Sequence, residues 1–138
     1  MKLRIKGNSI RLRLCQSEVL RLAIDGTVED FTEFGPFRTQ RLGYAICAAP
    51  ELRGVNASFT DCRIIVRVPG SILQRWAMTD QVSIEALQRT GGHADLRILI
   101  EKDFQCIDAA TGESQEDAFP NPRFGSTYLP ANTIARPA

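Results

Sequence analysis

The first fourteen residues, MKLRIKGNSIRLRL, alternate between aliphatic and mostly basic side chains on both sides of a Gly7-Asn8 pair. Alternation with a period of two is typical of strands that bury one face, and glycine at the first central position suits a two-residue type II′ turn. The pattern predicts a β-hairpin of residues 2–6 and 9–14 in which Arg4 faces Arg11. A slip of one residue would set aliphatic against basic side chains, so the register is firmly specified.

The rest of the chain predicts short strands and two short helices. One helix begins near Gln16, capped by Cys15 or by Ser17, the better oxygen donor of the two, and ends at Gly26; the other spans residues 71–78 and is capped by Ser71. The remaining strands are expected over residues 27–34, 43–48, 57–68, 81–88 and 95–104. Because most connections are short and hairpin-like, we expect an α+β fold with a mainly antiparallel, strongly curved or barrel-like sheet of about six to seven strands.

The length of 138 residues suits one domain. We expect a single α+β domain over residues 1–122 and an irregular, proline-containing tail over 123–138, with no internal repeat. The sequence has no apolar run of membrane-spanning length and no signal-peptide core, so the expected location is cytoplasmic, without membrane contact.

The cysteines and the single histidine lack the spacing of a metal site. The four cysteines are Cys15, Cys47, Cys62 and Cys106, and His93 is predicted at a loop tip. Zinc sites use clustered ligands at short spacing. We therefore expect reduced thiols that pack as small hydrophobes, and no cofactor.

Three blocks of the sequence resemble a family of small bacterial proteins of unknown function. They are K-L-R-I-K-G-N-S-I-R within residues 2–19, E-K-D-F-Q-C at 101–106 and E-D-A-F-P-N-P at 116–122. The family pattern has K-I-R-I-K in the first block, so Leu3 is a mild departure. The resemblance implies no catalytic residue, because the family is described only as a domain of unknown function, and residues 123–138 extend beyond it.

The face of the predicted hairpin that carries the basic residues needs a source of negative charge to offset their mutual repulsion. Basic residues that face each other across a hairpin cost a few tenths of a kcal/mol per pair, while residues 101–117 carry six acids and one lysine. One hypothesis is that these acids, together with Glu29, Asp30 and Glu33, cover the basic face.

A second hypothesis is an anion site for a phosphorylated small molecule, because arginine forks match phosphate and carboxylate groups. Its candidate residues are Arg4, Arg11, Arg13, Arg63, Arg67 and Arg97. Glu85, Glu101 and Asp103 are weak candidates to hold a divalent metal beside it. The simpler alternative is that the alternating charges form the solvated face of a sheet.

Nucleic acid is disfavoured as a partner, because the net charge is only +1 and the alternation places no aromatic residue on the basic face.

Trp76 is expected in the core. The segment 117–122, DAFPNP, predicts a docked extended strap anchored by Phe119, either on its own chain or in a dimer.

These observations favour a non-catalytic binding or interaction module whose partner is a second copy or another protein. The alternative is an enzyme or sensor that binds a phosphorylated small molecule on the arginine-bearing face. A pocket that combines Arg11, Arg13 or Arg67 with a carboxylate pair would favour the alternative.

Overall fold

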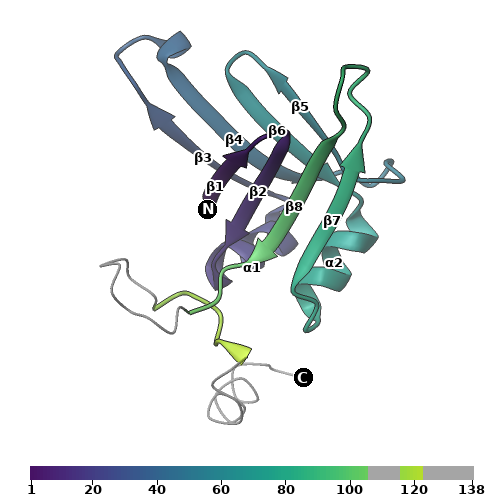
Figure 1. The fold of residues 1–138 in the computed structure, drawn as a ribbon. Coiled ribbons are helices and arrows are strands. Elements are labelled where there is room, and N and C mark those ends of the chain that lie inside the picture. The colour runs from purple at the N-terminus through teal and green to yellow at the C-terminus, as the bar shows by residue number, and fades with distance from the viewer. Residues whose placement is uncertain (106–115, 123–138) are drawn as a thin grey trace.

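Eight strands and two helices form the part of the chain that the computed structural model describes, residues 1–105 and 116–122. In chain order these are β1 (Lys2–Lys6), β2 (Ser9–Leu14), α1 (Gln16–Asp25), β3 (Thr27–Glu33), a 3-10 turn η1 (Arg38–Gln40), β4 (Arg41–Ala48), β5 (Asn56–Thr60), β6 (Arg63–Val68), α2 (Gly70–Met78), β7 (Ser83–Gln88) and β8 (Leu96–Lys102) (Figure 1). The tail expected over residues 123–138 lies outside the described residues.

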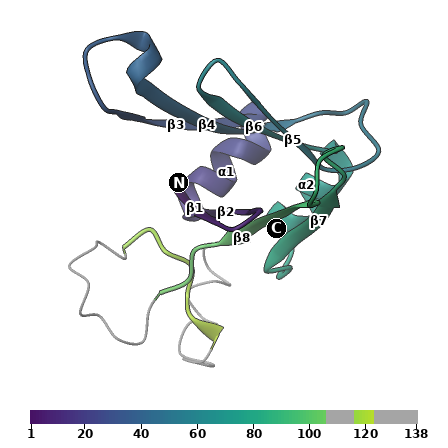
Figure 2. The ribbon, with the colours of Figure 1, turned by 45° about the horizontal axis from the view of Figure 1, so that its top comes forward.

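The strands form two four-stranded sheets. Sheet A has the order β1-β2-β8-β7, and sheet B has the order β3-β4-β6-β5. Figure 2 shows α1 between the two sheets and α2 beside β7. The outer pairs of each sheet are antiparallel hairpins, whereas the central pairs β2–β8 and β4–β6 are parallel.

The α+β class is therefore confirmed, but the finer expectation of one mainly antiparallel, barrel-like sheet needs correction. The described residues form eight strands rather than six or seven, in two sheets that do not close into a barrel, and two of their six strand pairings are parallel. Alternation along a strand predicts its pairing inside a hairpin, since that pairing is local. It carries no information about which hairpins then lie side by side.

The N-terminal hairpin has the predicted register, from Lys2 opposite Arg13 to Lys6 opposite Ser9. Gly7 has a φ of 55°, as the first central residue of a type II′ turn requires. Ile10, Leu12 and Leu14 of β2 are buried, while Arg11 and Arg13 lie on the opposite face. The prediction is therefore confirmed for β2, whereas Ile5 of β1 is 59% exposed.

The two helix starts compare differently with the prediction. Of the two predicted caps of α1, the structure has Cys15, whose backbone N–H donates to Oε2 of Glu18 at 3.0 Å, and not Ser17. The α2 helix begins at Gly70 directly after Pro69, so Ser71 is already inside its first turn. The predicted end of α1 is confirmed: Gly26 has a φ of 77° and donates its N–H to the Leu22 carbonyl at 3.0 Å.

The strand predicted over residues 57–68 is wrong, because it is a hairpin of β5 and β6. Asp61 and Cys62 form its turn with φ angles of 51° and 59°. Two consecutive residues with positive φ define a type I′ turn, which usually contains Asn-Gly or Asp-Gly. Aspartate followed by cysteine lacks that signal, so the alternation was read as one continuous strand.

The two halves of the described fold have the same topology, although the sequence shows no repeat. Adding 54 to every residue number of the β1–β2 register gives the β5–β6 register, from Asn56 opposite Arg67 onward. The same shift relates the parallel ladders β2–β8 and β6–β4. Each half is a unit of two strands, a helix and two strands. Each sheet combines the first hairpin of one unit with the second hairpin of the other.

The core repeats in the same way. Ile10, Leu12 and Leu14 correspond to Ile64, Val66 and Val68, and all six are buried. Leu22 of α1 corresponds to Trp76 of α2, which is fully buried, as predicted, and donates its indole N–H to the Val82 carbonyl at 3.0 Å. Apart from Ile10 and Ile64, these positions share only their apolar character, which explains why the sequence did not reveal the duplication.

The predicted strap at 117–122 docks on its own chain. Phe119 exchanges backbone hydrogen bonds with the segment after β8: its N–H donates to the Asp103 carbonyl at 2.7 Å, and its carbonyl accepts from Gln105 at 2.8 Å. Its ring lies 6.0 Å from that of Phe104. Asp117 accepts the backbone N–H of Gln16 at 2.8 Å, so the strap joins the end of β8 to the start of α1.

Candidate functional site

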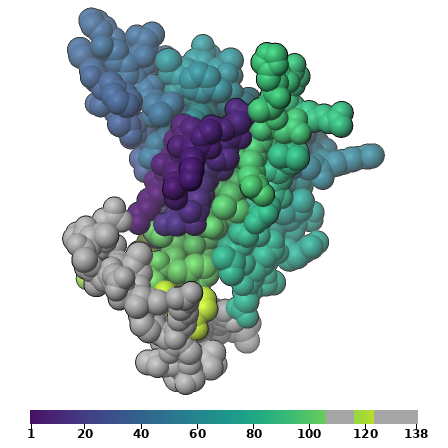
Figure 3. Space-filling view, viewed as in Figure 1, coloured from purple at the N-terminus to yellow at the C-terminus, as the bar shows by residue number. Residues whose placement is uncertain are grey.

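The outer face of sheet A carries the basic residues of the N-terminal hairpin and faces the viewer in Figures 1 and 3. Its side chains form three rows across the sheet. The rows are Lys2-Arg13-Glu101-Ser83, Arg4-Arg11-Leu99-Glu85 and Lys6-Ser9-Arg97-Leu87. The parallel β2–β8 ladder therefore brings Glu101 and Arg97 beside residues that lie about ninety positions earlier in the chain.

One end of this face is neutralised by its own carboxylates. Oε1 of Glu101 accepts hydrogen bonds from Nε of Arg13 at 2.9 Å and from the Arg11 guanidinium. Asp103 forms an ion pair with Lys2, at 3.0 Å between Nζ and Oδ2. Glu101 is only 14% exposed, so its ion pairs are partly shielded from water.

The other end carries Arg4, Lys6 and Arg97, all exposed. None of the three forms an ion pair with a residue in the ranges 1–105 and 116–122. The turn beside them is held in place by Asn8, whose side-chain amide donates to the Asp95 carbonyl at 2.8 Å. We call Arg4, Lys6 and Arg97 the basic end of sheet A.

The other two predicted anion-binding arginines lie on sheet B. Arg63 pairs with Glu29, and Nη1 of Arg67 donates to Oγ of Ser58 at 3.0 Å. The structure thus brings together four of the six predicted arginines and places the remaining two on a different sheet. Glu29 covers Arg63 rather than the N-terminal hairpin.

Glu101 and Asp103, the weak metal candidates, both face basic side chains. Within the described ranges no three histidine, cysteine, aspartate or glutamate side chains are grouped as a metal site would need. His93 lies in the exposed loop between β7 and β8, where it was predicted. Cys106 lies outside the described residues.

A second polar cluster surrounds the start of α1. Burial alone would raise the pKa of Glu18, but hydrogen bonds from the Met1 amino group and from Cys15 outweigh it and lower that pKa. Asp117 accepts hydrogen bonds from Ser17, and its pKa is also lowered, although its slight burial opposes the shift. Burial raises the pKa of the Cys15 thiol. The cluster connects the strap to the start of α1 through Asp117 and Ser17.

Sequence reasoning missed a group of exposed phenylalanines at one end of sheet B. We call Phe31, Phe34, Phe37 and Phe59 the aromatic tip. Phe34, Phe37 and Phe59 are 74%, 70% and 67% exposed, and the Arg41 guanidinium lies 4.7 Å from the centre of the Phe31 ring. The available signal was F-T-E-F-G-P-F at 31–37, because aromatic residues that flank a Gly-Pro turn lie at a loop.

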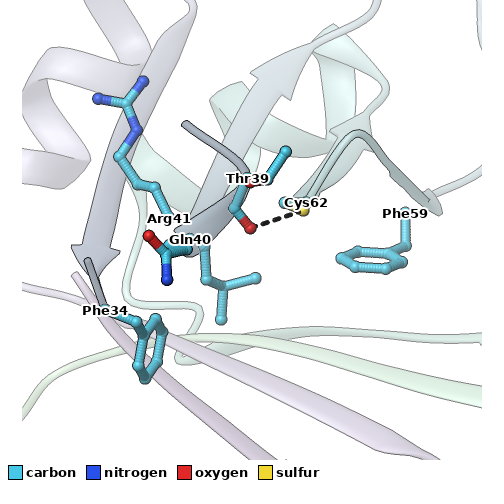
Figure 4. A pocket seen from close by; sticks show the side chains of 7 residues that line it. Phe34, Thr39, Gln40, Arg41, Phe59 and Cys62 are labelled. Carbon is cyan, nitrogen blue, oxygen red and sulfur yellow. Dashed lines mark hydrogen bonds between the residues drawn. The ribbon is translucent and has the colours of Figure 1, made fainter. Parts of the chain in front are cut away.

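The aromatic tip contains an open cavity of about 320 Å³. Phe34 and Phe59 lie on opposite sides of the cavity (Figure 4), and Leu42 also lines it. Cys62 lines the same cavity and donates its S–H to the Thr39 carbonyl at 3.6 Å. The lining is apolar in character, in contrast with the basic face of sheet A.

Comparison of the sequence with models of known protein families shows which family the chain belongs to. A family model described as a family of unknown function (DUF7009) matches residues 1–123. The chain belongs to this family. The match ends one residue after the strap, so the DUF7009 region includes both sheets and the strap that closes them. No curated protein and no solved structure matches the chain.

The family assignment agrees with the resemblance seen in the three sequence blocks, and it brings no known activity to this DUF7009 chain. In three dimensions the blocks meet. The first supplies Lys2, Arg11 and Arg13, the second supplies Glu101 and Asp103, and the third docks between them and α1. None of the helices in the described ranges has the length and apolar character needed to cross a membrane.

Proposed function

We propose that the protein is a non-catalytic interaction module that binds an acidic segment of a protein partner on the outer face of sheet A. The observation that carries this proposal is the division of charge along that face. Glu101 and Asp103 neutralise one end, whereas Arg4, Lys6 and Arg97 form no ion pair with any carboxylate in the described part of the chain.

The composition of the basic end suits a peptide better than a bare anion. Leu87 stands in the same row as Arg97 and is 68% exposed, and Leu99 lies in the next row. A partner segment that carries both acidic and apolar side chains would satisfy the cations and cover these leucines. The open face of a sheet can accept such a segment along its length.

The test is fluorescence anisotropy with a labelled peptide of alternating glutamate and leucine, titrated with the full chain. We expect saturable binding that weakens as salt is added, since salt screens exposed charges. Charge reversal by Arg4→Glu and Arg97→Glu should weaken binding at least about tenfold. Arg53→Glu makes the same change of charge on an exposed loop and should leave the affinity within about twofold.

Equal losses for Arg53→Glu and Arg97→Glu would show an unspecific response to net charge and overturn the proposal. Inorganic tripolyphosphate provides the second arm of the experiment. If tripolyphosphate raises the melting temperature and the peptide does not bind, the alternative gains support, namely a sensor or enzyme for a phosphorylated small molecule.

A further inference from the structure

The aromatic tip requires an explanation that the basic face does not supply. Most large apolar side chains in a folded domain are covered, and a group of exposed ones marks an interaction surface. Aromatic residues and arginine are the residue types that most often dominate binding energy at protein interfaces. The tip combines its phenylalanines with Arg38 and Arg41, both exposed.

The tip combines a cavity with an exposed ring that does not line it. Phe34, Leu42 and Phe59 form a cavity, and Phe37, which does not line it, projects from the same β3–β4 connection. A cavity and a projecting side chain on one surface meet the requirement of a two-fold interface, in which each copy offers both parts.

The charged residues around the aromatic tip also allow the tips of two copies to approach each other without net repulsion. The strands and turns that surround it, residues 27–48 and 56–68, carry four arginines and four acids whose formal charges sum to zero: Arg38, Arg41, Arg63, Arg67, Glu29, Asp30, Glu33 and Asp61. Interleaved charges of both signs can face their opposites when such a surface meets its own copy. The basic end of sheet A, by contrast, would repel itself.

We propose that two copies of the chain associate through their aromatic tips, with Phe37 of each copy inserted into the Phe34–Leu42–Phe59 cavity of the other. The occupant of the cavity is thus a phenyl ring. This assembly leaves the outer face of sheet A free, so it is independent of the acidic-partner proposal and is tested separately.

Analytical ultracentrifugation of the full chain provides the first test. We expect a species of twice the 15.3 kDa chain mass that dissociates on dilution. Phe37→Ala and Phe59→Ala should each raise the dissociation constant at least about tenfold. Leu87→Ala removes a side chain of matched exposure on sheet A and should leave the constant unchanged. Because all three side chains are exposed, circular dichroism should show an intact fold.

A cross-linking experiment tests the arrangement of the two copies. A chain with Phe37→Cys and Cys62→Ser is mixed with wild-type chain, which keeps Cys62 in its cavity. A short bis-maleimide should join position 37 of one chain to Cys62 of the other, as peptide mass spectrometry would show. Leu87→Cys with Cys62→Ser is the matched control and should give no such product.

A wild-type chain that remains monomeric at the highest protein concentration reached would overturn the proposal. The cavity would then not be filled by Phe37 of a second copy. A dimer that Phe37→Ala and Phe59→Ala leave equally tight would overturn it as well. A covalent product in the Leu87→Cys control equal to that of the Phe37→Cys chain would exclude the proposed orientation.

Discussion

Glu101 and Arg13 are direct neighbours across the parallel β2–β8 ladder, and Oε1 of Glu101 accepts the Arg13 Nε–H at 2.9 Å. The same oxygen accepts a hydrogen bond from Arg11, so one carboxylate compensates two guanidinium groups that share a strand face. Arg4 lies opposite Arg11 on β1. Glu101 therefore holds together a face that would otherwise repel itself.

Replacing this carboxylate should destabilise the fold. Glu101→Gln leaves Arg11 and Arg13 without their anion, and we expect the free energy of unfolding to fall by about 1–2 kcal/mol. The measurement is urea denaturation at low and at high salt, and the loss should shrink at high salt because the remaining repulsion is screened.

Glu85→Gln is the matched control for this substitution. Glu85 lies on the same face, opposite Leu99, and is exposed without an ion pair in the described residues. Its replacement should change stability by less than about 0.5 kcal/mol. Equal effects of the two substitutions would contradict the role given to Glu101.

Removing the anchor of the strap should loosen both the strap and the start of α1. Phe119 packs against the core, and Nζ of the buried Lys102 lies 5.4 Å from the centre of its ring. Phe119→Ala should cost about 2 kcal/mol, somewhat less than for a fully buried phenylalanine. Hydrogen exchange at the Gln16 amide should accelerate, because its acceptor is the Asp117 carbonyl. Unchanged exchange at Gln16 would show that the strap is not coupled to α1.

Acid should destabilise the protein through Glu18. Burial opposes the shift, but the hydrogen bonds from Met1 and Cys15 hold the folded-state pKa of Glu18 below its ordinary value of 4.5. The unfolded state then binds the proton more tightly, so this stabilisation is complete above the ordinary pKa and is lost as pH falls through the lowered one. Stability measured from about pH 6 to about pH 3 should fall less steeply for Glu18→Gln than for wild type. Parallel curves would be inconsistent with this assignment.

The turn between β5 and β6 offers a stabilising substitution. Cys62 holds a φ of 59°, a left-handed conformation that costs a side-chain-bearing residue roughly 1 kcal/mol. Cys62→Gly should relieve this strain and raise the free energy of unfolding by about that amount, less the weak hydrogen bond to Thr39. Thermal denaturation would check the sign, and a lower melting temperature would mean that the thiol contact outweighs the strain.

Gly26 provides the converse case. Its φ is 77°, and a Cβ built there would meet Cβ of Ala48 at 3.8 Å, an ordinary contact. Gly26→Ala should therefore cost about 1 kcal/mol through backbone strain alone. A much larger loss in urea denaturation would indicate steric conflict instead.

The sequence was most informative where structure depends on near neighbours. The N-terminal hairpin was predictable down to Lys6 opposite Ser9, because alternation and a Gly-Asn turn fix both pairing and face. The end of α1 at Gly26 was predictable for the same reason. The Asp61-Cys62 turn was not, since its left-handed residues carry no glycine signal.

The candidate sites were predictable only in part. The sequence identified the basic residues and the acids that could compensate them, but the choice of Glu101 for Arg11 and Arg13 depends on the parallel β2–β8 pairing across the whole chain. The same pairing brings Arg97 beside Ser9. The aromatic tip was not predicted, because the alternation places Phe31, Phe34 and Phe59 in strands and gives no sign that they lie near Phe37 at one end of a sheet.

The repeated topology means that neither half of the described fold can complete a sheet by itself. The hairpin β1–β2 finds its neighbour in β7–β8, and β3–β4 finds its neighbour in β5–β6. A peptide of one unit, two strands, a helix and two strands, could form four-stranded sheets of this kind only with a second copy of the same peptide. The two halves therefore pair their hairpins, within one polypeptide, in the same way as two identical short chains that exchange hairpins in a dimer.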